Sequence, residues 1–105
     1  MKSWQTTDGN TIIRILSGRS NSFLLTNGKQ HVLIDTGPKN MWKKLQNRLN
    51  ALQIDHIDFL ILTHAHFDHA GNAHRIKEKY NSRVIVHRND ATHLAAGNEH
   101  HCFRY

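Results

Sequence analysis

The feature that most constrains this chain is a cluster of metal-binding side chains placed directly after a short apolar run. The chain carries His64, His66, Asp68 and His69 within six positions. The preceding run at residues 59–62 is short, unbroken and apolar, which predicts a buried strand. Because side chains alternate along an extended segment, His64 and His66 are expected to point to the same side and bind one ion. Asp68 and His69 follow where the chain is expected to turn into a helix, which suits a second ion nearby.

The donor types in this cluster indicate which metals it prefers. Neutral imidazole combined with carboxylate fits zinc, with iron, manganese or cobalt as alternatives. The competing interpretation is a solvated loop in a chain that has ten histidines among 105 residues. The strand in front of the cluster and the helix expected behind it favour the metal site.

The order His-x-His-x-Asp-His between a hydrophobic strand and a helix resembles the signature of the metallo-β-lactamase superfamily. The resemblance covers most of the chain. Residues 32–37 are similar to an earlier strand-end motif of that family, and residues 83–87 are similar to its strand after the motif helix. The resemblance implies a bound metal and a hydrolytic reaction.

The resemblance also implies a role for each residue of the site. His64 and His66 would belong to the first metal site, and Asp68 and His69 to the second. Asp68 would in addition be the catalytic residue that orients or deprotonates the reacting water. Asp35 would belong to the supporting shell around the ligands.

Asp35 allows two interpretations from the residues alone. It follows the apolar run at residues 32–34 and precedes Gly37 and Pro38, which end the strand sharply. A carboxylate at such a strand terminus can hold a ligating imidazole in one tautomer. The alternative is a turn aspartate that bonds the amides after it. The sequence around Asp35 favours neither interpretation by itself. The resemblance to the family favours the supporting role.

The remaining pattern predicts an α/β chain, the N-terminal half of the αββα metallo-β-lactamase sandwich. Its order is an antiparallel meander, a helix, a strand, a helix and a strand. Asn27-Gly28 is a hairpin signal within the meander, and Asn40 is a candidate helix cap. His56 and Asp58 are interpreted as exposed loop residues at the far end of the strand from His64. The predicted strands cover residues 11–17, 21–26, 30–35, 59–62 and 84–86, and the helices cover residues 40–52 and 68–80, with a short helix after Asn89 or Asp90.

Length and ligand count raise the question of completeness. A chain of 105 residues fits one domain with a modest core, so residues 1–105 are expected to form a single truncated domain without the second half of the fold. A catalytic zinc takes three protein ligands plus water, whereas the cluster offers two ligands to each ion.

Three explanations for the missing ligands stay open. The chain is the N-terminal portion of a longer hydrolase, or it forms a homodimer in which two copies face each other, or other histidines complete the set. We favour the first for the origin of the sequence and the second as the way such a piece stays soluble. The candidate histidines for the third are His87, His93, His100 and His101.

Composition bounds location and partners. The chain has no apolar run long enough to span a membrane and no signal-like start, so we expect a cytoplasmic protein that does not bind membranes. A single cysteine, Cys102, fits a reducing compartment and is interpreted as an incidental tail residue. The formal charge of +6 is compatible with binding to nucleic acid. However, the basic residues are scattered, with no run longer than Lys43-Lys44, so solvated helix faces explain them at least as well.

The sequence therefore predicts a zinc-dependent hydrolase in which activated water attacks a carbonyl of a small molecule: an ester, a thioester, a lactone or a β-lactam. One alternative is a nuclease or phosphodiesterase of the same superfamily. The other is an inactive metal-binding remnant. Whether this chain alone is an enzyme is left open.

Overall fold

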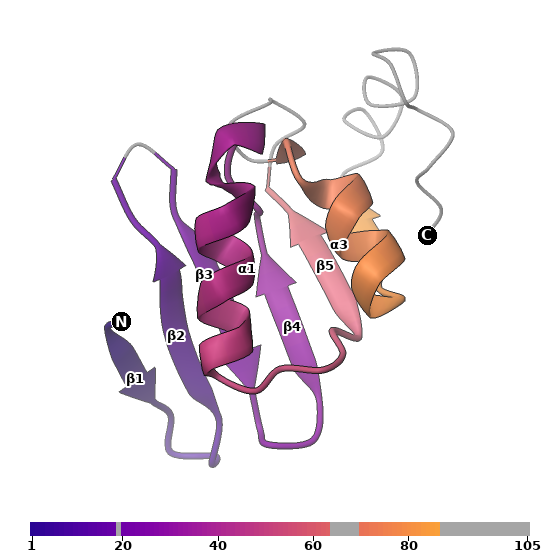
Figure 1. Ribbon diagram of the computed structural model, residues 1–105. Coiled ribbons are helices and arrows are strands. Elements are labelled where there is room, and N and C mark those ends of the chain that lie inside the picture. The colour runs from indigo at the N-terminus through magenta and orange to yellow at the C-terminus, as the bar shows by residue number, and fades with distance from the viewer. Residues whose placement is uncertain (19, 64–69, 87–105) are drawn as a thin grey trace.

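The structure is a computed structural model, and it describes residues 1–18, 20–63 and 70–86 (Figure 1). Predictions that concern Asn89, Asp90, Cys102 or the histidines at 87, 93, 100 and 101 lie outside these residues. The elements are the strands β1 Ser3–Gln5, β2 Thr11–Leu16, β3 Ser22–Thr26, β4 His31–Ile34, β5 Phe59–Leu62 and β6 Arg83–Val86, the 3-10 helix η1 Lys39–Met41, and the helices α1 Trp42–Ala51 and α3 Ala73–Tyr80.

The six strands form one sheet in the order β1-β2-β3-β4-β5-β6. The first four strands pair antiparallel, and β4-β5 and β5-β6 pair parallel. The predicted meander of β2, β3 and β4 is thus confirmed, and β1 is an additional short edge strand. Parallel neighbours need a crossover, which α1 supplies before β5 and α3 before β6. The α/β class and the order of elements are confirmed.

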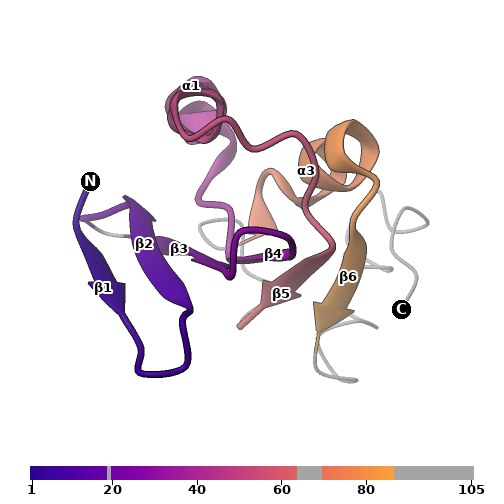
Figure 2. The ribbon, with the colours of Figure 1, turned by 90° about the horizontal axis from the view of Figure 1, so that it is seen from below.

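Both helices lie on the same face of the sheet (Figure 2). The reason is the shared handedness of the two crossovers, since each moves the chain one strand further in the same direction. Within the described residues the opposite face of the sheet carries no helix.

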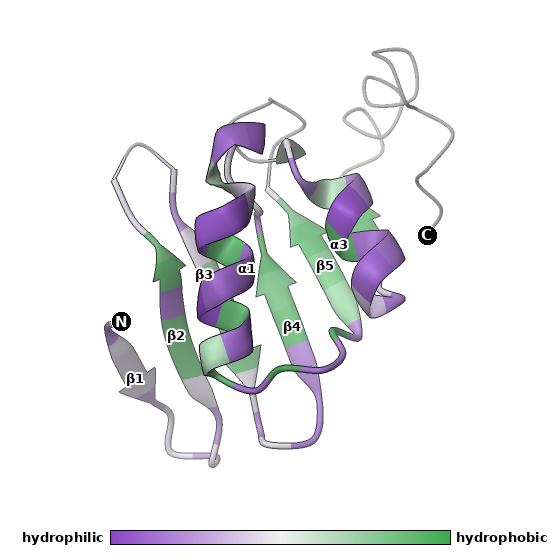
Figure 3. Ribbon diagram, viewed as in Figure 1, coloured by the Kyte–Doolittle hydropathy of each residue, from purple (hydrophilic) through white to green (hydrophobic). Residues whose placement is uncertain are grey.

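The core lies between the sheet and the two helices. One row of fully buried side chains runs across four strands in register: Leu24, Leu33, Leu60 and Val84. Leu45 and Leu49 of α1 and Ile76 of α3 are also fully buried and belong to the same core cluster. Hydrophilic residues of both helices face away from the sheet, while the central strands are strongly hydrophobic (Figure 3). The described helices are too short or too polar to cross a membrane.

The face of the sheet away from the helices is also apolar. Its side chains alternate with the core row along each strand, as expected for extended chain. On the central strands they are half-buried, whereas toward the two edges Trp4 is 40% exposed, Ile85 is 42% exposed and Arg83 is also exposed. The central members in register are Phe23, Ile34, Ile61 and Ile85.

One helix start differs from the prediction, and a second predicted helix is interrupted. Asn40 is not a cap, because residues 39–41 form a 3-10 turn in which the Met41 N–H donates to the Pro38 carbonyl at 3.0 Å, and α1 begins at Trp42. Within the helix expected over residues 68–80, Ala70 is helical, a turn at Gly71 and Asn72 interrupts the helix, and α3 then runs over Ala73–Tyr80. Asn72 interrupts the helix because its side chain bonds the chain after β4 instead.

Candidate metal centre

The predicted metal-ligand motif, residues 64–69, follows β5 in the sequence, and β5 ends at the carboxyl edge of the parallel strands. Thr63 is the last described residue before it, and Ala70 is the first after it. The predicted ligands and the predicted catalytic residue lie outside the described residues, so their arrangement stays a prediction: His64, His66, Asp68 and His69. The structure does describe what holds the two ends of this segment.

The first end is held by Asp35, which follows β4 and is 5% exposed. Its N–H donates to the Ile61 carbonyl at 2.9 Å, which extends the β4-β5 ladder by one bond. Its carboxylate accepts two bonds from Thr63, from the backbone N–H at 2.8 Å and from the hydroxyl at 2.6 Å. The carboxylate therefore reaches across to the residue that immediately precedes His64. Its predicted role in orienting a ligand remains a prediction.

The backbone of Asp35 is itself in a costly conformation, with φ of +62°. This left-handed region is uncommon for residues other than glycine, although aspartate adopts it more readily than most. The hydroxyl of the buried Ser22 donates to the Asp35 carbonyl at 2.7 Å and helps to fix the conformation. The left-handed turn places the carboxylate beside the end of β5 rather than in line with β4.

The second end is held by Asn72, which is fully buried. Its backbone N–H donates to the hydroxyl oxygen of Thr36, also fully buried, at 3.0 Å. Its side-chain amide donates to the carbonyls of Pro38 at 2.7 Å and Thr36 at 3.3 Å. The segment after β4, residues 35–38, thus bonds both the entrance and the exit of the metal motif. Sequence reasoning missed this role of Asn72 and Thr36.

Gly37 gives this segment its shape. Its φ is +72°, and a Cβ atom there would lie 2.9 Å from Cδ1 of the buried Leu16. A side chain at position 37 would both strain the backbone and press on the core. The sequence prediction that Gly37 ends the strand sharply is confirmed.

The donor set fits a metal, although the described residues do not form a metal site by themselves. Within the described ranges, no three His, Cys, Asp or Glu side chains come together to hold an ion. A site of the predicted kind therefore depends on residues 64–69. Their imidazole nitrogens and carboxylate oxygen are donors that suit zinc and its first-row neighbours.

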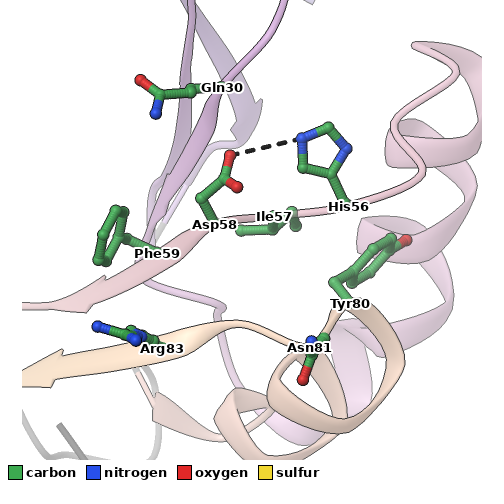
Figure 4. Close-up of a pocket in the computed structure, with 8 residues that line it drawn as sticks. All are labelled: Gln30, His56, Ile57, Asp58, Phe59, Tyr80, Asn81 and Arg83. Atoms are coloured by element: carbon green, nitrogen blue, oxygen red, sulfur yellow. Dashed lines mark ion pairs between the residues drawn. The ribbon is translucent and has the colours of Figure 1, made fainter.

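His56 and Asp58 lie at the opposite end of β5 from Thr63, as expected. They line a pocket with Gln30, Tyr80 and Arg83 (Figure 4).

His56 and Asp58 are structural rather than simply exposed. Asp58 Oδ2 accepts the His31 N–H at 2.9 Å, and His56 Nε2 lies 3.0 Å from the Lys29 carbonyl. These bonds fasten the hairpin between β3 and β4 to the loop before β5.

The two imidazoles at this end should titrate on opposite sides of the ordinary histidine value. The pKa of His56 is raised, chiefly by its hydrogen bond to Asp55 at 2.8 Å. The pKa of His31 is lowered, first by burial and then by His56, whose ring centroid lies 4.7 Å away. We expect an NMR titration to give a pKa above 6.5 for His56 and below 6.5 for His31.

Two substitutions check the causes of these shifts. Asp55→Asn should move the pKa of His56 down toward 6.5, and His56→Gln should move the pKa of His31 up. His74, on the outer side of α3, lies far along the chain from this pair and serves as an internal control. Unchanged titration of both histidines in both variants would contradict the described contacts.

Comparisons with known proteins agree with the fold. The family model described as Metallo-beta-lactamase superfamily matches residues 17–102. A probable metallo-hydrolase of Methanocaldococcus jannaschii is 38% identical over 80 residues, which are 76% of this chain and 38% of that protein. An anaerobic nitric oxide reductase flavorubredoxin of Enterobacter sp. (strain 638) is 32% identical over 95% of this chain and 21% of that protein.

Solved structures show the same arrangement. A metallo-β-lactamase with a HARLDQ motif from Cronobacter sakazakii superposes with a TM-score of 0.76 and 27% identity, covering 92% of this chain and 38% of that chain. BJP-1, a subclass B3 metallo-β-lactamase of Bradyrhizobium japonicum, superposes with a TM-score of 0.76 at 19% identity and supports the fold alone. This chain spans less than two fifths of the length of each of these relatives and structures.

Proposed function

Because the chain belongs to the metallo-β-lactamase superfamily, we propose that it supplies the metal-binding motif of a metal-dependent hydrolase. His64 and His66 bind one ion, and Asp68 and His69 bind a second. Zinc suits these donors, with iron, manganese or cobalt as alternatives. The observation that supports the proposal most is that residues 35–38 bond both Thr63 and Asn72, the two ends of this motif.

The reaction we propose is attack of water on a carbonyl carbon of a small molecule. The substrate is an ester, a thioester, a lactone or a β-lactam. The metal, when bound, supplies Lewis acidity that makes water more acidic and polarises the carbonyl oxygen. Asp68 accepts the proton that the attacking water loses. Asp35 keeps Thr63, and with it the start of the motif, against the end of β4.

The partners we propose follow from the ligand count and from the sheet. Two protein ligands for each ion are fewer than the three of a typical catalytic zinc. We propose that the missing ligands come from a second sheet-and-helix unit that packs on the open apolar face of the sheet. That unit is a complementing second half of the fold or a second copy of this chain.

The test is an assay of the zinc-loaded chain against a chromogenic β-lactam, a lactone, a thioester and a phosphodiester, with its solution mass measured alongside. In self-associated protein we expect turnover of at least one carbonyl substrate and a loss of about 10²-fold or more in Asp68→Asn at saturating zinc, whereas monomeric protein lacks the second unit and should turn over none. The matched control is Asp8→Asn, because Asp8 is exposed in the turn between β1 and β2.

The other outcomes decide between the alternatives. Cleavage of the phosphodiester alone, with affinity for nucleic acid that falls steeply with salt, would favour a nuclease and overturn the carbonyl substrate. Zinc binding by self-associated protein without turnover of any substrate would overturn the second copy as the source of the missing ligands and favour an inactive metal-binding remnant.

A further inference from the structure

The buried amide of Asn72 is bonded in an unusual way. Its donor side faces three successive backbone carbonyls, those of Thr36, Gly37 and Pro38, at 3.3, 3.5 and 2.7 Å. Its acceptor oxygen Oδ1 is buried and has no hydrogen-bond partner among the described residues. A buried acceptor without a partner costs free energy. The side chain is therefore placed to hold the segment after β4 through its donor side alone.

The bonds at the other end of the motif are formed by the same segment. Asp35 bonds Thr63 through both carboxylate oxygens, and Thr36 accepts the backbone N–H of Asn72. Thr63 and Asn72 are separated by eight residues, and six of these are the motif positions 64–69. These two sets of hydrogen bonds, which we call the fastenings, come from adjacent residues, 35 and 36. They therefore fix the distance between Thr63 and Asn72 that the motif must bridge.

We propose that Asn72 and Thr63 are positioning residues for the metal ligands, a role that rests on the proposed function. By fixing where the motif leaves and rejoins the fold, they restrict the conformations that His64, His66, Asp68 and His69 can sample before an ion binds. Less conformational freedom is then lost on binding, so the affinity for metal is higher. Neither residue donates a ligand.

The first test measures cobalt, whose visible spectrum reports the geometry of its ligands. In the full chain, Asn72→Ala should weaken Co²⁺ binding about 10- to 100-fold and change the spectrum of the bound ion. The matched control is Ile76→Val, which alters another fully buried residue near the start of α3 and leaves the fastenings intact. The unfolding free energy of each variant is measured alongside its Co²⁺ affinity. A loss of affinity that exceeds the loss expected from reduced stability is then assigned to positioning.

Thr63 provides a second variant, which changes an exposed residue and leaves the packing of the core intact. Thr63→Val removes the hydroxyl that donates to Asp35 and should weaken Co²⁺ binding about 10-fold. Thr63→Ser keeps the hydroxyl and should restore the affinity to within about twofold of the unsubstituted chain. Serine lacks the methyl group of threonine, so rescue by serine would show that the hydroxyl, and not packing of the methyl group, supports the Co²⁺ affinity.

A third readout needs no metal and separates this inference from the proposed function. In the metal-free chain, exchange of the Thr63 and Asn72 amide protons should be slow, and Asn72→Ala should speed exchange at Thr63 and position 72 more than Ile76→Val does. A chain that binds no Co²⁺ but shows this pattern would overturn the metal site and the positioning of ligands, while the fastening itself would stand. Equal effects of Asn72→Ala and Ile76→Val on exchange and on Co²⁺ affinity would overturn the inference.

Discussion

Replacing His64 and His66 together by alanine will remove zinc from the first site and lower the zinc content of the purified chain. The expected loss of affinity is at least about 100-fold, since even residues outside the ligand shell change metal affinity by about 10- to 100-fold. Elemental analysis after dialysis against a weak chelator gives the content, and competition with a coloured chelator gives the affinity. His69 and Asp68 remain in this variant, so residual binding at the second site should be weak.

The control for this experiment uses two histidines that the structure places in other interactions. His56, in the loop before β5, bonds the Asp55 carboxylate and the Lys29 carbonyl. His74 pairs with Glu78 on the surface of α3 at 2.8 Å. The double variant His56→Ala with His74→Ala removes the same number of imidazoles and should keep the zinc content. Equal zinc loss in the two double variants would mean that zinc binds histidines at random.

The second large effect concerns the fold. Leu33→Ala should lower the free energy of unfolding by about 2–5 kcal/mol, the range for truncating a fully buried leucine. Leu33 is 0% exposed and lies in register between Leu24 and Leu60 in the middle of the sheet. Urea unfolding followed by circular dichroism measures the change. A native domain is stable by only about 5–15 kcal/mol, so the loss is a large share of the total.

Ile85→Ala is the matched control on the opposite face of the sheet. In the monomeric chain Ile85 is 42% exposed, so its truncation there removes less buried surface and should cost distinctly less than Leu33→Ala. A cost for Ile85→Ala as large as that for Leu33→Ala would show that the open face is covered in solution, and so would support the proposed second sheet there.

Much of the fold follows from local patterns. The apolar runs, the Asn27-Gly28 turn and the stripe of the first helix each lie within a few residues, and these elements were predicted close to their observed bounds. β1 was not predicted, because three residues carry too little alternation and the strand forms by pairing Ser3 with Ile13 across the turn. The interruption before α3 was not predicted, because it depends on a partner of Asn72 that lies 36 residues away.

In the site, too, features encoded locally could be predicted, and features that depend on distant residues could not. The candidate ligands are visible in the sequence because they cluster within six positions after a strand. Asp35 was noticed as a strand-end carboxylate, but its partner Thr63 lies 28 residues later and becomes visible only when β4 and β5 pair in parallel. The amide of Asn72 gave no signal of its own, since an asparagine before a helix is usually a cap and this one makes no side-chain cap bond.

The central claim is that the residues between Thr63 and Asn72 bind a transition metal. The most direct test is a crystal of the zinc-loaded chain with anomalous scattering measured on both sides of the zinc absorption edge. We expect an anomalous peak about 2.0–2.1 Å from an imidazole nitrogen of His64 and of His66. A well-ordered zinc-loaded crystal whose anomalous peaks lie only at other histidines would contradict the claim.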